Sequence, residues 1–141
     1  MLDHLLGVQA LLLRWGANID VADAGLFHSV YGTEVFHRPP IPESDRSIVR
    51  GLIGQKAERL VWLYCCMRRN DFESAAADRT PDHIVRHATG EPVAIVPDEA
   101  SALMNLLAAD VLEQLARRPL RNRRRVEAVF KLRRHLMPGA Y

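Results

Sequence analysis

The sequence predicts an all-helical protein with at most one short hairpin, organised as a single domain over residues 1–141. Two observations predict this class. Apolar residues recur at helical spacing along most of the chain, and glycines and prolines interrupt them at intervals typical of helix ends. A hydrophobic content of 48% against 26% charged residues is that of an ordinary globular chain, long enough for one buried core.

The first half of the chain is expected to form four helices. Asn18 or Asp20 can cap the second helix, and Gly32 ends it. Three prolines make residues 32–43 a loop, because proline cannot continue a helix. The four expected ranges are Leu2–Trp15, Val21–Tyr31, Asp45–Ile53 and Gln55–Arg68.

The second half is expected to contain a loop, a short helix, an extended piece and two long helices. Residues 70–78 are small and polar, which favours a loop. Thr80 and Pro81 are typical of a helix start. The expected ranges are a helix from Pro81 to Ala88, a turn with an extended piece or hairpin over 89–97, a helix over Asp98–Arg117 and a basic helix over Leu120–Leu136.

The composition bears on membranes, secretion and disulfides. No apolar run reaches the roughly 18 residues that span a bilayer, and no basic start is followed by an apolar segment and a cleavage site. We therefore expect a cytoplasmic protein with no membrane partner. Cys65 and Cys66 are adjacent and have no other cysteine to pair with, so they are interpreted as buried thiols.

The positive charge is concentrated at the end of the chain. Residues 117–141 carry nine of the 19 Lys and Arg residues, against the lone Glu127. Such a run can bind phosphates by releasing counterions. No nucleic-acid module accompanies it, so a solvated helix, or one lying against an acidic surface of the same or a second subunit, is the favoured interpretation.

Two histidines are the main candidates for chemistry. His28 lies in an apolar run near the end of the second expected helix, and His4 lies near the start of the first. Antiparallel packing of these helices would bring the two imidazoles together. Converging imidazoles with nearby carboxylates can hold a divalent ion between helices, whereas two histidines at the edge of the core can simply bond backbone carbonyls.

The stretch AGLFHSVYGTE, residues 24–34, resembles the HD-domain signature of metal-dependent phosphohydrolases, most closely the AALLHDVVEDT form of the ppGpp hydrolases. The run from residue 2 to 67 also resembles an uncharacterised HD-like family with the hallmark HSVYGT. The resemblance implies an HD-like helical bundle. It matches His4 to the first metal ligand, His28 to the histidine of the HisAsp pair, and Glu58 in AERLV to the later aspartate of ADRLH.

The sequence departs from this signature at the acidic positions. Ser29 stands where the HisAsp pair has its aspartate, and Gly32 and Thr33 replace the expected Glu and Asp. A hydroxyl is a poorer ligand for a hard divalent ion than a carboxylate. The resemblance therefore implies at most a mononuclear site of His4, His28 and Glu58, suited to Zn or Fe(II). The alternative is a decayed site in which His28 bonds Ser29, Tyr31 or Asp110.

Other polar residues can assist the two histidines in chemistry or binding. Tyr31 and Thr33 are expected to line a pocket beside His28, and Asp110 lies among apolar neighbours on the long helix. Asp110 is interpreted as a partner of a histidine, a general base with a raised pKa, or a salt-bridged residue. His83 and His87, four residues apart on the expected short helix, are assigned to a solvated face.

Three functions follow from these observations. The first is a small-molecule enzyme of HD-like type, a mononuclear metal-dependent hydrolase or a related lyase or oxygenase, in which His28, Tyr31, Thr33 and Asp110 act on the substrate. The second is a catalytically silent binding or assembly domain, including a homodimer. The third, the least favoured, is a nucleic-acid-associated protein that uses the basic tail.

Overall fold

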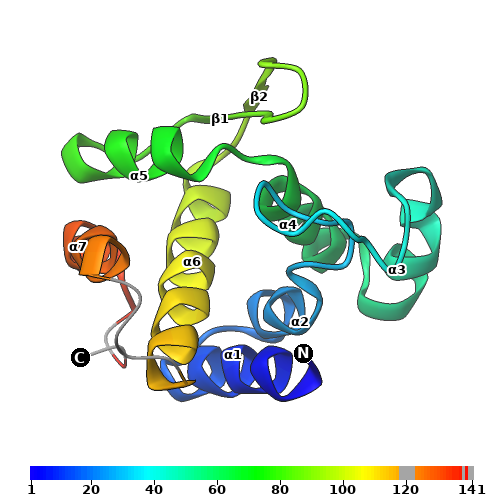
Figure 1. The fold of residues 1–141 in the computed structure, drawn as a ribbon, viewed down its shortest axis with the longest axis horizontal. Coiled ribbons are helices and arrows are strands. Elements are labelled where there is room, and N and C mark those ends of the chain that lie inside the picture. The colour runs from blue at the N-terminus through cyan, green and yellow to red at the C-terminus, as the bar shows by residue number, and fades with distance from the viewer. Residues whose placement is uncertain (118–122, 138, 140–141) are drawn as a thin grey trace.

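The protein is an assembly of helices with one two-stranded antiparallel sheet, so the predicted fold class is confirmed (Figure 1). The computed structural model describes residues 1–117, 123–137 and 139. The elements are α1 (Leu2–Arg14), α2 (Ile19–Phe27), η1 (Glu43–Asp45), α3 (Arg46–Ile53), α4 (Gln55–Cys66), α5 (Arg69–Asp78), β1 (His83–Val85), β2 (Pro92–Ala94), α6 (Pro97–Arg117), α7 (Arg123–Leu132) and η3 (Arg133–His135).

Helix α6 is at the centre of the packing. Figure 1 shows it between α7 on one side and α2 and α4 on the other, with α1 crossing one end. Helices α1, α2, α4 and α7 all contact α6. Most of its residues are buried because neighbours cover it on several sides. The residues of α6 that form the apolar core include Leu103, Met104, Leu106, Leu107 and Val111.

Helices α1 and α2 pack closely at a glycine. Val8 and Leu12 of α1 are fully buried, and they face Gly25 of α2. A Cβ atom at position 25 would lie 2.6 Å from Leu12 Cδ1 and 3.3 Å from Val8 Cγ1. The missing side chain therefore permits the close approach that brings the start of α1 beside the end of α2.

The second helix is shorter than the sequence predicts. It begins as expected, because the Val21 N–H donates to the Asn18 side chain at 3.1 Å. It ends at Phe27 rather than Tyr31, and His28 is its C-terminal cap. The following turns have the Val30 N–H donating to the Phe27 carbonyl and reach Gly32, whose φ is +79°.

Two segments after α4 differ from the prediction. Residues 70–78, expected as a loop, belong to α5, because the alanines at 75–77 favour a helix and Phe72 and Ala76 share a buried face. Residues 83–85, expected as part of a helix, form β1 and pair with β2 in the register Ile84 opposite Val93. The β-branched Ile84 and Val85 favour the strand, and the hairpin expected further along begins here.

The hairpin docks on the C-terminal end of α4. The Arg68 N–H donates to the Val85 carbonyl, and the His87 N–H donates to the Cys66 carbonyl, both at 2.8 Å. His83 and His87 therefore do not share a helical face. The His83 ring pairs with Asp82, and the His87 Nε2–H donates to the Cys65 carbonyl at 3.1 Å.

The terminal basic helix is described only in part. Helix α7 ends at Leu132, which is fully buried, and the chain continues into η3 rather than extending the helix to Leu136. The predicted start at Leu120 lies outside the described residues. Among the described helices, none combines the length and the apolar composition that crossing a membrane would require.

The close contact at Gly25 predicts opposite effects for two glycine substitutions. Gly25→Ala should lower the free energy of unfolding by about 1–3 kcal/mol, because the new methyl group overlaps the buried Leu12. Gly51→Ala in α3 meets nothing within 4 Å and should raise it by about 0.5–1 kcal/mol, through the better helix propensity of alanine. Urea unfolding of both variants tests this. If both substitutions change the free energy of unfolding in the same direction, the packing described for Gly25 is wrong.

Candidate metal centre

The site is built around two histidines that the first two helices bring together. His4 is in the first turn of α1 and His28 caps α2. Their ring centroids are 5.2 Å apart, with an interplanar angle of 79°. The predicted convergence of the two imidazoles is therefore confirmed.

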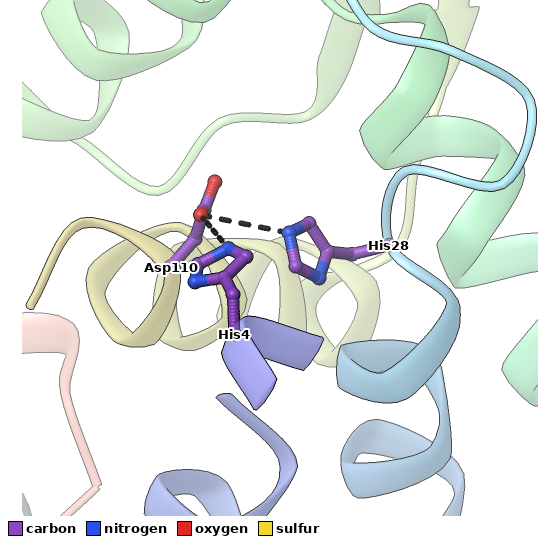
Figure 2. A group of neighbouring side chains, drawn as sticks. All are labelled: His4, His28 and Asp110. Carbon is purple, nitrogen blue, oxygen red and sulfur yellow. Dashed lines mark hydrogen bonds and ion pairs between the residues drawn. The ribbon is translucent and has the colours of Figure 1, made fainter. Parts of the chain in front are cut away.

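Asp110 of α6 completes the group (Figure 2). Its Oδ1 lies 3.0 Å from His4 Nε2 and 3.5 Å from His28 Nε2. His28 and Asp110 are only 3% and 1% exposed, whereas His4 is half-buried. The three side chains come from three helices, and each offers one ligand atom to a common point.

The other nitrogen of each imidazole is held by an acceptor. The His28 Nδ1–H donates to the Gly25 carbonyl at 2.7 Å, and the His4 Nδ1–H donates to Glu113 of α6. In a neutral imidazole the remaining Nε2 then carries the lone pair. Both Nε2 atoms face Asp110 Oδ1, to which a protonated ring would donate a hydrogen bond and where a neutral ring would offer its lone pair to an ion. A backbone carbonyl or carboxylate behind a metal-binding histidine is the usual arrangement around a metal ion.

Tyr64 and Arg69 fix the orientation of the Asp110 carboxylate. The Tyr64 hydroxyl donates to Oδ2 at 2.5 Å, and Arg69 Nη2 lies 3.4 Å from the same oxygen. The Arg69 guanidinium also lies over the Tyr64 ring, 5.0 Å from its centroid. These contacts occupy Oδ2 and leave Oδ1 toward the imidazoles, where the Gln114 side chain also donates to it at 2.9 Å.

The pKa values in this group follow from burial and the surrounding charges. Burial alone would raise the pKa of Asp110, but the His28 and His4 rings and the Arg69 charge hold that pKa well below its usual range. The direction of this shift is opposite to the raised pKa expected of a general base at Asp110. The hydrogen bond to Asp110 is the largest cause that raises the pKa of His4, and burial opposes it.

Two of the three separations in this group suit a divalent ion. Two ligands of a tetrahedral ion with bonds of about 2.0–2.1 Å lie about 3.3 Å apart, which is close to the 3.0 and 3.5 Å separations from Asp110 Oδ1, and the three ligand atoms all lie within 4.8 Å of one another. Two imidazole nitrogens and one carboxylate oxygen are ligands that suit Zn or Fe(II). The group could therefore hold a metal ion.

The structure does not bring Glu58, the predicted third ligand, to this group. Glu58 is 1% exposed, and Arg46 Nε and Nη2 donate to its two oxygens at 2.6 and 2.8 Å. The Tyr31 hydroxyl donates to the same carboxylate at 2.8 Å. Arg46 and Tyr31 hold Glu58 away from this group, and Asp110 is the carboxylate that reaches both histidines.

Tyr31 and Thr33 line a cavity of about 250 Å³, although the sequence predicts a pocket that they share with His28. The described lining includes neither of the two histidines of the metal centre nor Asp110. The Thr33 hydroxyl accepts hydrogen bonds from the Phe36 and Val35 N–H groups, and Tyr31 is held by Glu58. Both hydroxyls therefore have structural partners, and neither is placed at the metal centre.

The two cysteines also border this cavity and are buried, as predicted. Burial raises the pKa of the Cys65 thiol to about 12 and that of the Cys66 thiol to about 11. The Cys65 Sγ–H donates to the His28 carbonyl at 3.2 Å. Both groups are protonated thiols at neutral pH, which excludes them as activated nucleophiles.

The sequence did not predict four side chains that contact the histidines or Asp110, which are Glu113, Gln114, Tyr64 and Arg69. One signal was available for Glu113, because it lies three residues after Asp110 and shares its helical face. Tyr64 and Arg69 belong to α4 and α5, and no local pattern links them to Asp110. Only the packing of α4 and α5 against the rest of the fold places them there.

Comparison with known proteins gives a family match for the first half of the chain. Residues 1–69 match the model of a family described as a domain of unknown function, DUF6817. No curated protein and no solved structure matches the chain. The matched segment contains His4 and His28, whereas Asp110 lies beyond it.

The Glu58 contacts predict a pH-dependent loss of stability. Burial alone would raise the pKa of Glu58, but hydrogen bonds from Arg46 and Tyr31 lower it. A carboxyl with a lowered pKa in the folded state stabilises the protein above its unfolded pKa of about 4.3, and this contribution is lost as the pH falls through the folded value. Glu58→Gln should lower the free energy of unfolding at pH 7 by about 1–3 kcal/mol.

Urea unfolding of wild type and Glu58→Gln between pH 7 and pH 3 measures this effect. The difference between the two proteins should narrow as the pH falls below about 4. Glu127→Gln, at an exposed position of α7, is the control and should change little at any pH. A Glu58→Gln difference that stays constant over this range would contradict the assignment.

Proposed function

We propose that this chain is an HD-like, metal-dependent enzyme acting on a small molecule, in which His4, His28 and Asp110 hold one divalent ion. The observation that carries the proposal is the orientation of the imidazoles. Each Nδ1–H is held by an acceptor, and each Nε2 faces Asp110 Oδ1. Two histidines from the first two helices and an aspartate from a later helix also follow the order of ligands in the HD-domain resemblance.

The donor set favours Zn or Fe(II) and a single ion. Ser29 provides a hydroxyl where the HD signature has a carboxylate, so little negative charge remains for a second ion. A divalent ion in this place would polarise a substrate oxygen or lower the pKa of a water molecule, which favours hydrolysis.

The residues around the centre have separate tasks in this proposal. Glu113 and the Gly25 carbonyl orient the two rings, and Tyr64 and Arg69 hold the second Asp110 oxygen. The His4 side chain is 16% exposed, against 4% for His28 and 1% for Asp110. The substrate would therefore approach beside the start of α1.

A catalytically silent domain is the second candidate, and the Asp110 contacts favour it. The carboxylate already has partners on both oxygens, including Gln114, Tyr64 and Arg69. A protonated His4 could satisfy Asp110 in place of an ion, in line with the raised pKa of His4. In that case the cluster would stabilise the packing of helices around α6 and perform no chemistry.

Metal analysis separates the two candidates. Protein purified without chelator, or stripped and reloaded with Zn or Fe(II), should hold about one ion per chain. His28→Gln and Asp110→Asn should each lose it, because each removes one of three ligands. His83→Gln, at an exposed histidine, and Glu58→Gln, at the carboxylate held by Arg46, should keep the ion.

Three results would decide against the enzyme proposal or its ligand set. If the folded wild-type protein takes up no ion at neutral pH, the catalytically silent domain is the remaining candidate function. Loss of the ion in Glu58→Gln with retention in Asp110→Asn would restore the ligand set predicted from the sequence. Retention of the ion in His28→Gln would move the metal away from this cluster.

Glu113 should tune the affinity of this site without being a ligand. Glu113→Gln weakens the acceptor behind His4 Nδ1 and should reduce metal affinity by about 10–100-fold. Glu99→Gln is the matched control, since Glu99 is on the same helix and pairs with Arg59 instead. Competition with a chromogenic chelator measures both affinities. Equal affinities in the two variants would exclude the role assigned to Glu113.

A further inference from the structure

The outward side of α1 is an uninterrupted apolar stripe. The stripe consists of Leu2, Leu6, Ala10 and Leu13, which are all exposed. Leu2, Leu6 and Leu13 are 64%, 46% and 49% exposed. With 3.6 residues per turn, these positions fall on one side of the helix, opposite the buried Val8 and Leu12.

The exposure of these leucines is unusual, because the other side of α1 is buried against the rest of the protein. Helix α1 lies at the edge of the molecule in Figure 1, and its inner side contacts α2 and α6. An amphipathic surface helix normally has polar residues on its outer side, whereas this one has leucines. Contiguous exposed apolar residues of this kind mark interaction surfaces.

Two charged residues lie along one edge of the stripe. Asp3 is in the first turn of α1 and Arg14 is in the last, and both are exposed. They lie eleven residues apart in the sequence, which is close to three full turns, so they share the same edge of the helix. Within the described residues, neither has an ion pair.

We propose that this stripe is the surface through which two copies of the chain associate, with the two α1 helices packed antiparallel about a two-fold axis. In a two-fold pair each helix meets the same face of the other. Antiparallel packing places Asp3 of each copy beside Arg14 of the other. The small Ala10 near the middle then lies against Leu6 of the second copy.

The charges favour a second copy over another occupant. An antiparallel pair centred midway between Asp3 and Arg14 places opposite charges together at both ends of the contact, and this centre lies about one residue from the midpoint of the stripe. In a parallel pair the two copies of this charged edge would lie on opposite sides of the contact and Asp3 would not meet Arg14, so only the antiparallel pair gains this attraction. The inference does not depend on the proposed function, because the stripe lies on the side of α1 away from the buried residues that pack beside His4.

The proposed interface is small, so we expect the two copies to bind each other weakly. Helix α1 has 13 residues and is about 20 Å long. A pair of such helices buries less than the roughly 800 Å² per partner of a standard interface. We therefore expect a reversible dimer with a Kd of roughly 1–100 µM.

Sedimentation velocity of the full chain over about 1–500 µM tests the proposal. The wild type should show a monomer–dimer equilibrium. Leu6→Asp should weaken the dimer by at least about 10-fold, since it places two charges in the apolar contact. Ile48→Asp, at a 53% exposed position of α3, is the control and should dimerise as the wild type does.

A charge exchange tests the antiparallel arrangement itself. Arg14→Asp alone should weaken the dimer by about 5–10-fold, because two acidic residues then meet at each end. Combining it with Asp3→Arg should restore the affinity to within about 3-fold of the wild type. Circular dichroism checks that each variant retains its helices, and the metal content of Leu6→Asp should stay unchanged.

Each other outcome would overturn the proposal. A chain that stays monomeric to about 500 µM would leave the stripe to a different partner. A dimer that Leu6→Asp does not weaken would use another surface. A double variant no tighter than Arg14→Asp alone would exclude the antiparallel pairing of Asp3 with Arg14.

Discussion

The organisation of this fold depends on how a single buried carboxylate is satisfied. Asp110 is 1% exposed, and an ionised group in such a place costs several kcal/mol unless charged and hydrogen-bonding groups surround it. Its partners come from all around the core: His4 from α1, His28 from the end of α2, Tyr64 from α4 and Arg69 from α5. One side chain on the central helix therefore links four other segments of the chain, and their packing fixes the geometry at its two oxygens.

The arrangement of His4, His28 and Asp110 can hold either a proton or a metal ion. The two imidazole Nε2 atoms face one carboxylate oxygen, and an ion between them would take the place of a shared proton. The groups behind the rings, Glu113 and the Gly25 carbonyl, support metal binding because they fix which nitrogen is free. The dense contacts on Asp110 support the alternative, in which the cluster only holds the helices together.

The sequence predicted the parts of this site that depend on short-range order. The apolar pattern and the glycine punctuation located α1 and α2, and the contact between these two helices brought His4 and His28 together as expected. Glu58 was assigned through a motif resemblance, but its carboxylate is held by Arg46 across the contact between α3 and α4. Asp110 was predicted as a partner of a histidine or as a catalytic group, but not as a metal ligand. No local pattern places α6 beside α1, so its role required the tertiary structure.

The most direct test of the account is a crystal structure of the metal-loaded protein, with anomalous diffraction measured at the zinc and iron absorption edges. We expect one anomalous peak, about 2.0–2.2 Å from the Nε2 atoms of His4 and His28 and from the nearer oxygen of Asp110. A map with no peak between these three atoms, and with His4 Nε2 hydrogen-bonded directly to Asp110 as it is here at 3.0 Å, would contradict it.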